Sequence, residues 1–266
     1  MLWGNDLTQS AAGPFSRIHF DLQANSARIR LNHSPLNVID VLMMQELRRA
    51  LAVTGDTSVP IIVFEGSPSA FSAGVDVAAH APDTVDEMLT LFHAIINSIV
   101  ESHKVTVAAV RGHCLGGGAE LAMVCDMVIT SETATWGFPE IKLACYPPVA
   151  VTALSGVVGQ KQAADLILTG RSIDGKKAVD IGLATQAVPD GQVESALQEK
   201  VNLLSNLSPA ALSLTKQAMY HWNAAHFDKG LARAGKIYLE ELMKTHDAKE
   251  GISAFLEKRQ PKWGSE

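Results

Sequence analysis

The sequence is poor in charge. Asp, Glu, Lys and Arg make up only 19% of its 266 residues, whereas 47% are hydrophobic. This composition excludes a disordered chain, because a sizeable core can be buried. The charges sum to −6, and such a field does not attract nucleic acid or an anionic membrane. We therefore expect no nucleic-acid partner and no membrane partner.

Cysteine is also scarce. Cys114, Cys125 and Cys145 form an odd set without CxxC spacing, which argues against a disulfide framework and a zinc site. The nine histidines show no metal-ligand spacing either. We expect three buried free thiols and no bound metal.

Long hydrophobic runs are missing. No apolar run approaches the ~18 residues that span a bilayer. Residues 1–13 lack the basic segment and apolar run of a signal peptide. Together with the free thiols, these absences predict a cytoplasmic protein.

Short apolar runs alternate with amphipathic segments along the first part of the chain. The expected strands are residues 15–22, 27–31, 60–65, 105–110 and 126–130. The expected helices are 38–53, capped by Asp40, 84–100, 208–220, 231–243 and 247–259. The strand–turn–helix–strand order predicts an α/β core with parallel strands. We expect this core over residues 1–190 and a helical region over residues 191–266.

Two glycine-containing turns follow predicted strands. Gly116, Gly117 and Gly118 come directly after one strand and open a helix, where free N–H groups attract negative charge. The pattern fits neither GxGxxG nor a P-loop, and tight helix–strand packing explains it equally well. The second turn, AFSAGVD (70–76), follows another strand. Two such turns can bring two backbone N–H groups together as an oxyanion hole.

Two acids accompany these turns. Glu120 lies in the first helical turn after the glycines, where it could simply stabilise the helix dipole. Glu140 lies between Pro139 and Ile141, in a setting too apolar for an ordinary surface acid. Enclosed, paired carboxyl groups have raised pKa values, and two acids around one water suit general acid–base chemistry.

Three motifs together indicate a family. AFSAGVD, RGHCLGGGAELAMVCD and ATWGFPEIKL, in this order, resemble the crotonase (enoyl-CoA hydratase/isomerase) superfamily. The resemblance extends over residues 15–259. It implies a crotonase-type ββα superhelix, or spiral, followed by a C-terminal helical trimerisation region. It further implies an acyl-CoA thioester substrate, no metal or redox cofactor, and a homotrimer or a homohexamer built as a dimer of trimers.

The resemblance also implies roles for residues. Val75 and Gly117 match the oxyanion-hole positions, and Glu120 and Glu140 match both acids of the hydratase subgroup. Members with other chemistries often keep one acid or neither, so two acids favour water addition; which one is the base stays open. The implied substrate or CoA contacts are Leu36, Ser72, Ala73, Asp76, Gly116 and Lys258.

One stretch departs from the common hydratase pattern. Ordinary hydratases have a glycine-rich stretch after the second acid, whereas this chain has Tyr146, Pro147 and Pro148. That change alters a wall of the acyl pocket and argues against a plain straight-chain crotonyl substrate. Residues 37–40, 170–175 and 238–259 most resemble cyclohexa-1,5-diene-1-carbonyl-CoA hydratases of anaerobic benzoyl-CoA degradation. We expect that activity, with 6-hydroxycyclohex-1-ene-1-carbonyl-CoA as the product.

Three alternatives stay open. The first is a 2-enoyl-CoA hydratase of fatty-acid oxidation. The second is an enoyl-CoA isomerase, which the two acids disfavour. The third is a non-catalytic acyl-CoA- or RNA-binding homologue, which the two acids and the net charge of −6 disfavour.

Overall fold

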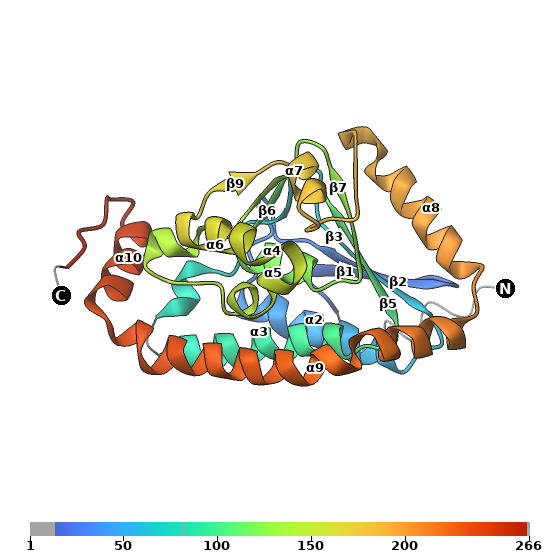
Figure 1. Cartoon of the computed structure of the whole chain (residues 1–266), viewed down its shortest axis with the longest axis horizontal. Coiled ribbons are helices and arrows are strands. Elements are labelled where there is room, and N and C mark those ends of the chain that lie inside the picture. Colours follow the sequence, from blue (N-terminus) through green and yellow to red (C-terminus); the bar gives the residue numbers. More distant parts are fainter. Residues whose placement is uncertain (1–13, 82, 265–266) are drawn as a thin grey trace.

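The chain winds through repeated strand–strand–helix turns that build two sheets (Figure 1). The computed structural model describes residues 14–81 and 83–264. Residues 1–13, from which we expect no signal peptide, lie outside the described residues. The strands are β1 (Ile18–Leu22), β2 (Ser26–Leu31), β3 (Ile61–Glu65), β4 (Ala70–Ser72), β5 (Val105–Val110), β6 (His113–Leu115), β7 (Met127–Ser131), β8 (Thr135–Gly137), β9 (Ser172–Ile173) and β10 (Gln186–Val188). The α-helices are α2 (Val41–Gly55), α3 (Val85–Val100), α4 (Gly117–Met123), α5 (Pro148–Val158), α6 (Gln160–Thr169), α7 (Gly175–Asp180), α8 (Val193–Ser205), α9 (Pro209–Glu240) and α10 (His246–Leu256), and the 3-10 helices are η1 (Val77–His80), η2 (Pro139–Leu143), η3 (Asp190–Gln192) and η4 (Leu242–Lys244).

Strands of the two sheets alternate along the chain from β3 to β8. The six-stranded sheet has the order β1-β2-β3-β5-β7-β10, and every neighbouring pair except β1–β2 is parallel. The four-stranded sheet has the order β4-β6-β8-β9. Strands β3, β5 and β7 are each followed by a short strand of the second sheet and then by a helix. This repeat is the ββα superhelix that the resemblance implies.

Helices cover both faces of the larger sheet. Strand β5 (VTVAAV) is buried along its whole length, as expected for a parallel strand with two covered faces. The main core joins one face to α2 and α3. A smaller core joins the other face to α8 through Val193, Leu197 and Val201. The predicted division of the chain at residue 190 stays a prediction. Helix α8 comes after residue 190 in the chain and packs on the larger sheet.

The C-terminal helices differ from the expectation at one point. The prediction of separate helices over 208–220 and 231–243 is wrong, because α9 is one continuous helix of 32 residues. Gly230 does not end it: a Cβ at that position would lie 2.7 Å from Thr152 Cγ2, so the glycine allows close packing on α5. The predicted cap at Asp40 is confirmed, since its side chain accepts from the Met43 N–H at 2.7 Å. Ser208 caps α9 in the same way by accepting from the Ala211 N–H at 3.3 Å.

The expectation of three buried free thiols is confirmed for Cys114, Cys125 and Cys145.

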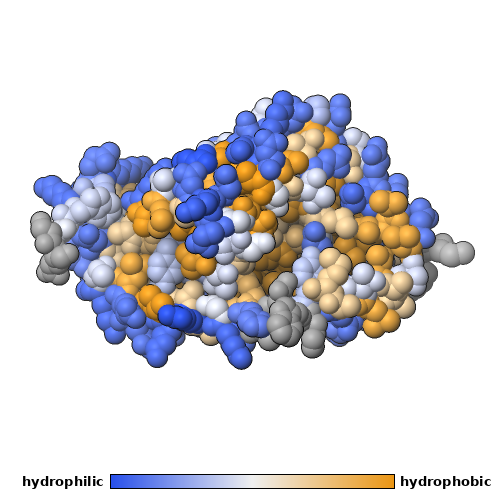
Figure 2. Space-filling model, viewed as in Figure 1, coloured by the Kyte–Doolittle hydropathy of each residue, from blue (hydrophilic) through white to orange (hydrophobic). Residues whose placement is uncertain are grey.

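In the part of the chain that the structure describes, no helix has the length and apolar character that crossing a membrane requires. Apolar side chains also reach the surface, and Figure 2 shows them gathered around a hollow near α5 on the face in view.

Candidate active site

Two turns meet at one edge of the four-stranded sheet. β4 ends at Ser72, β6 ends at Leu115, and these strands pair in parallel. Gly74 follows the first strand with φ +106°, and Gly116 follows the second with φ +51°. Both values lie in the region that favours glycine. The two glycine-containing turns therefore lie side by side, as the sequence suggests.

The backbone N–H groups of Val75 and Gly117 are neighbours at this edge. A Cβ built on Gly117 would lie 3.4 Å from the Val75 nitrogen and 2.7 Å from Val75 Cγ2. Gly117 is the first residue of α4, where N–H groups have no partner within the helix. Among the described residues, no loop or turn hydrogen bond uses either N–H. Both donors are thus available to a ligand.

The triple glycine also serves close packing. A Cβ at Gly116 would lie 2.5 Å from Glu140 Oε1, and one at Gly118 would lie 2.6 Å from Ser72 Cβ. Both alternatives that the sequence leaves open therefore apply, since the same glycines allow close approach and expose backbone donors.

Ser72 and Asp76 shape the first turn. The buried Ser72 hydroxyl donates to the Asn37 carbonyl at 2.7 Å and accepts from the Gly74 N–H at 3.0 Å. Asp76 caps η1 by accepting from the Ala78 N–H at 3.0 Å. These bonds hold the backbone that presents the Val75 N–H.

Glu120 is held by the N-terminus of α5. Its side chain is buried, and its Oε1 accepts from the N–H groups of Val149 and Ala150 at 2.8 and 2.9 Å. Pro147 and Pro148 lead the chain into this helix end. Burial raises the pKa of Glu120, and the two backbone hydrogen bonds oppose part of that rise because they favour the charged form.

Glu140 lies in η2 and its carboxyl group is enclosed. Its Oε2 is buried and has no hydrogen-bond partner within the described residues. Burial raises the pKa of Glu140, and the nearby charge of Glu120 raises it further. The two acids therefore titrate as a pair rather than as independent groups.

A cavity of about 290 Å³ joins the two turns and the two acids. Its polar edge is formed by Val75, Gly117, Glu120 and Glu140, and one wall is formed by residues 146–148. The predicted site residues that line it are Ala73, Val75, Gly116, Gly117, Glu120, Glu140, Tyr146, Pro147 and Pro148. Leu36, Ser72, Asp76 and Lys258 do not line it, and the contacts with CoA stay predictions.

Sequence reasoning missed several residues of this cavity. Phe92 comes from the apolar face of α3, and His80 comes from the end of η1. Tyr238 and Phe255 come from α9 and α10, far along the chain. Their residue types carry no distinguishing signal, because only tertiary packing brings them to the cavity.

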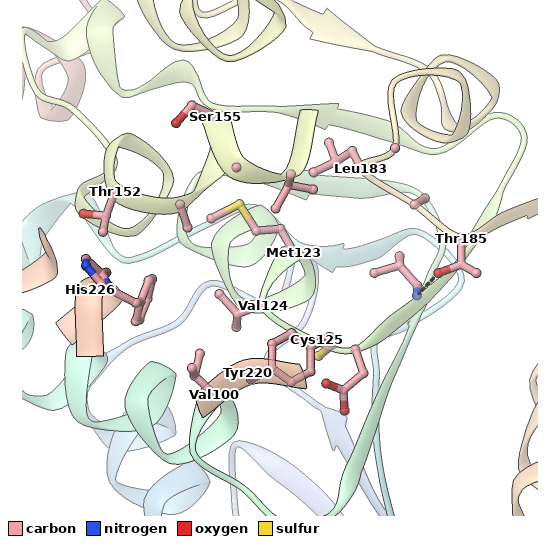
Figure 3. Close-up of a pocket in the computed structure, with 18 residues that line it drawn as sticks. Val100, Met123, Val124, Cys125, Thr152, Ser155, Leu183, Thr185, Tyr220 and His226 are labelled. Atoms are coloured by element: carbon pink, nitrogen blue, oxygen red, sulfur yellow. Dashed lines mark hydrogen bonds between the residues drawn. The ribbon is translucent and has the colours of Figure 1, made fainter. Parts of the chain in front are cut away.

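A larger cavity of about 650 Å³ lies elsewhere, between α4, α5 and α9 (Figure 3). Among the described residues that line it, Asp126 is the only acid. That carboxylate already pairs with Lys216 at 2.8 Å and accepts from the Thr106 N–H at 2.7 Å. The remaining lining is largely apolar, as Met123, Val124 and Leu183 show in Figure 3. The acid–base geometry is thus at the smaller cavity.

Comparison with known families agrees with this geometry. The family model described as enoyl-CoA hydratase/isomerase matches residues 21–266. The chain belongs to the enoyl-CoA hydratase/isomerase family. Because it belongs to this family and its relatives are named hydratases, the protein is an enzyme of the enoyl-CoA hydratase type that acts on acyl-CoA. Members of this family do not normally need a cofactor, and the described residues contain no His, Cys, Asp or Glu cluster that could hold a metal ion.

Individual relatives cover nearly the whole chain. A protein of Thauera aromatica named cyclohexa-1,5-dienecarbonyl-CoA hydratase is 32% identical over 93% of this chain and 96% of its own. A protein of Rhizobium meliloti named "Probable enoyl-CoA hydratase" is 38% identical over 90% of this chain and 94% of its own. The crystal structure of an enoyl-CoA hydratase from Mycobacterium avium subsp. paratuberculosis shares the fold, with a TM-score of 0.86 at 23% identity, over 95% of this chain and all of that one.

Proposed function

We propose that the enzyme adds water to cyclohexa-1,5-diene-1-carbonyl-CoA and forms 6-hydroxycyclohex-1-ene-1-carbonyl-CoA, in anaerobic benzoyl-CoA degradation. The observation that carries the proposal is the buried Glu120 and the enclosed carboxyl group of Glu140, beside two backbone donors in one small cavity. The Thauera relative supports the cyclic substrate. Pro147 and Pro148 support it as well, because they line the cavity and stand where the family resemblance gives ordinary hydratases a glycine-rich stretch.

In the proposed mechanism, the thioester oxygen lies between the N–H groups of Val75 and Gly117. These groups stabilise the negative charge that gathers on this oxygen as water adds. In other enzymes, removal of one such donor costs about 2.7–4 kcal/mol of barrier. The arrangement needs no nucleophilic side chain.

The reaction is a 1,4-addition. The water oxygen bonds to ring carbon 2, which is β to the carbonyl, while the base takes one water proton. The electron pair of the bond between carbons 1 and 2 enters a dienolate that extends over carbons 1, 6 and 5 and the thioester oxygen. The acid then protonates carbon 5, and the remaining double bond lies between carbons 1 and 6, as in the product.

The contacts of the two acids favour one division of roles. Glu120 accepts two backbone hydrogen bonds, which favour its charged form and suit a base. Glu140 has an unpartnered oxygen beside that charge, which favours its protonated form and suits an acid. At the end of the cycle, Glu120 loses its extra proton to solvent and Glu140 regains one from solvent.

A paired substrate assay tests the proposal. We expect faster hydration of the cyclic dienoyl-CoA than of crotonyl-CoA, with the product identified by mass spectrometry and NMR. Preference for crotonyl-CoA would instead support a 2-enoyl-CoA hydratase, the second candidate, which the name of the Rhizobium relative favours. Absence of ¹⁸O from labelled water in the product would indicate an isomerase.

We also propose that copies of the chain form a trimer or a hexamer through residues 191–266. The support is a set of exposed apolar side chains on α8, α9 and the segment between them: Leu203, Leu207, Leu214 and Met219. The free thiols further support a cytoplasmic location, where disulfides are rare.

A further inference from the structure

Tyr238 reaches the catalytic cavity from the long C-terminal helix. Its side chain is 1% exposed and lines the same cavity as Glu120 and Glu140. Burial raises the pKa of Tyr238, and the neighbouring Cys145 thiol and the two glutamates raise it further. The buried ring and the two acids thus line one cavity.

Tyr146 holds the turn of α9 that carries Tyr238. The two rings meet edge to face, with centroids 5.2 Å apart and planes at 85°. The Tyr146 hydroxyl donates to the Ala234 carbonyl at 2.6 Å. In an α-helix that carbonyl is also the acceptor for the Tyr238 N–H. One residue thus touches the Tyr238 ring and fixes its backbone.

Close helix packing prevents the Tyr238 ring from retreating. A Cβ at Gly235 would lie 3.2 Å from His93 Cε1 of α3, and one at Gly230 would lie 2.7 Å from Thr152 Cγ2 of α5. The two glycines let α9 lie tightly against both helices. On the far side, the His80 ring is 6.4 Å from the Tyr238 ring. The ring cannot move outward unless α9 moves with it.

We propose that Tyr238, held by Tyr146, is the end wall that limits the acyl group to a short or ring-shaped one. A cavity of about 290 Å³ lies at the lower limit of ligand pockets, so it takes an acyl group but not a long chain. Tyr238 and the two prolines line this same cavity, so together they restrict the length of the acyl group that it holds. This inference rests on the proposed function for the identification of the cavity as the acyl pocket.

The experiment measures binding of unreactive thioesters, so it does not depend on turnover. Dissociation constants of cyclohexanecarbonyl-CoA, butanoyl-CoA and octanoyl-CoA are determined by calorimetry for the wild type, Tyr238→Leu and Tyr238→Phe. The phenylalanine variant keeps the wall and loses only the hydroxyl, so it is the matched control. Because each result is a ratio between ligands, a partly folded preparation does not change it.

We expect the wild type and Tyr238→Phe to bind octanoyl-CoA at least about tenfold more weakly than the other two thioesters, since small differences in an apolar pocket change binding by about 10–200-fold. In Tyr238→Leu, the ratio of the dissociation constant of octanoyl-CoA to those of the other two thioesters should fall by about tenfold. An unchanged ratio in Tyr238→Leu, or equal binding of all three thioesters by the wild type, would overturn the role of Tyr238. Failure of the wild type to hydrate any enoyl-CoA would overturn the proposed function and leave the binding result valid.

Discussion

At the scale of the residue, the candidate site holds two carboxyl groups whose surroundings differ. Glu120 has two backbone donors on one oxygen, whereas Glu140 has a buried oxygen without a partner within the described residues. A buried polar atom without a partner is costly, so such an atom beside a cavity is typical of a group that meets its partner in the ligand.

Replacing either acid by its amide tests this assignment. We expect Glu120→Gln and Glu140→Gln each to lower kcat by about 10²–10⁴, because each removes one step of proton transfer. Turnover of the cyclic dienoyl-CoA is followed by mass spectrometry of the product. Exposed Glu199, replaced in the same way, is the control and should leave kcat unchanged. Near-normal hydration by both variants would contradict the assignment.

Glu140 should also make stability depend on pH. Its pKa is raised above the ordinary value of 4.5 by burial and by Glu120. As pH rises above 4.5, the unfolded chain loses this proton while the folded chain keeps it, so the free energy of unfolding falls until the folded pKa is passed. Glu140→Gln removes this loss. We expect the free energy of unfolding of the variant to exceed that of the wild type by up to a few kcal/mol at pH 9 and by little at pH 5.

Denaturant unfolding at pH 5, 7 and 9 measures this difference. Glu199→Gln again provides the control and should follow the wild type at all three values. A difference between Glu140→Gln and wild type that shrinks as pH rises would have the wrong sign and would contradict the raised pKa of Glu140.

At the scale of the element, the sequence predicts five of the six strands of the larger sheet and the two glycine turns, but it misses β10, the short strands of the four-stranded sheet and the assembled cavity. The predicted strands, the cap at Asp40 and the two glycine turns follow from local patterns, such as the largely apolar β5 and the glycines at 116–118. The continuity of α9 could not be predicted, because Gly230 is a weak helix former and only the structure shows its close packing on Thr152. Tyr238 was missed for the same reason, since its role arises from where α9 packs.

A buried ion pair fixes the start of α9 to the larger sheet. Lys216 Nζ lies 2.8 Å from Asp126 Oδ2 and donates to the Lys104 carbonyl at 2.8 Å. We expect Lys216→Met to lower the free energy of unfolding by about 3–5 kcal/mol, because it leaves the carboxylate of Asp126 without its cation. Denaturant titration measures the loss.

The same helix offers a matched control. Lys236 pairs with Glu240 at 3.8 Å, but both side chains are more than half exposed. Lys236→Met should therefore cost about 1 kcal/mol or less. Equal losses in the two variants would show that the pair at Lys216 does not anchor α9.

At the scale of the whole molecule, the low charge and the exposed apolar side chains have a common explanation in self-association. An apolar surface that water would otherwise cover is stabilised when a second copy buries it. Leu203 of α8 and Leu214 of α9 are exposed. We expect the proposed trimer or hexamer to bury these side chains between copies of the chain.

Leu214 is the sharpest test of that surface. It is 66% exposed on α9, so a charge there does not disturb the core of one copy. We expect Leu214→Lys to shift the mass measured by light scattering from the trimer or hexamer toward the single chain, because burying an unpaired ammonium group at an interface is costly. Leu214→Met keeps the site apolar and should retain the wild-type mass. A wild type that scatters as a single chain, or a Leu214→Lys variant with unchanged mass, would place the subunit contact away from this helix face.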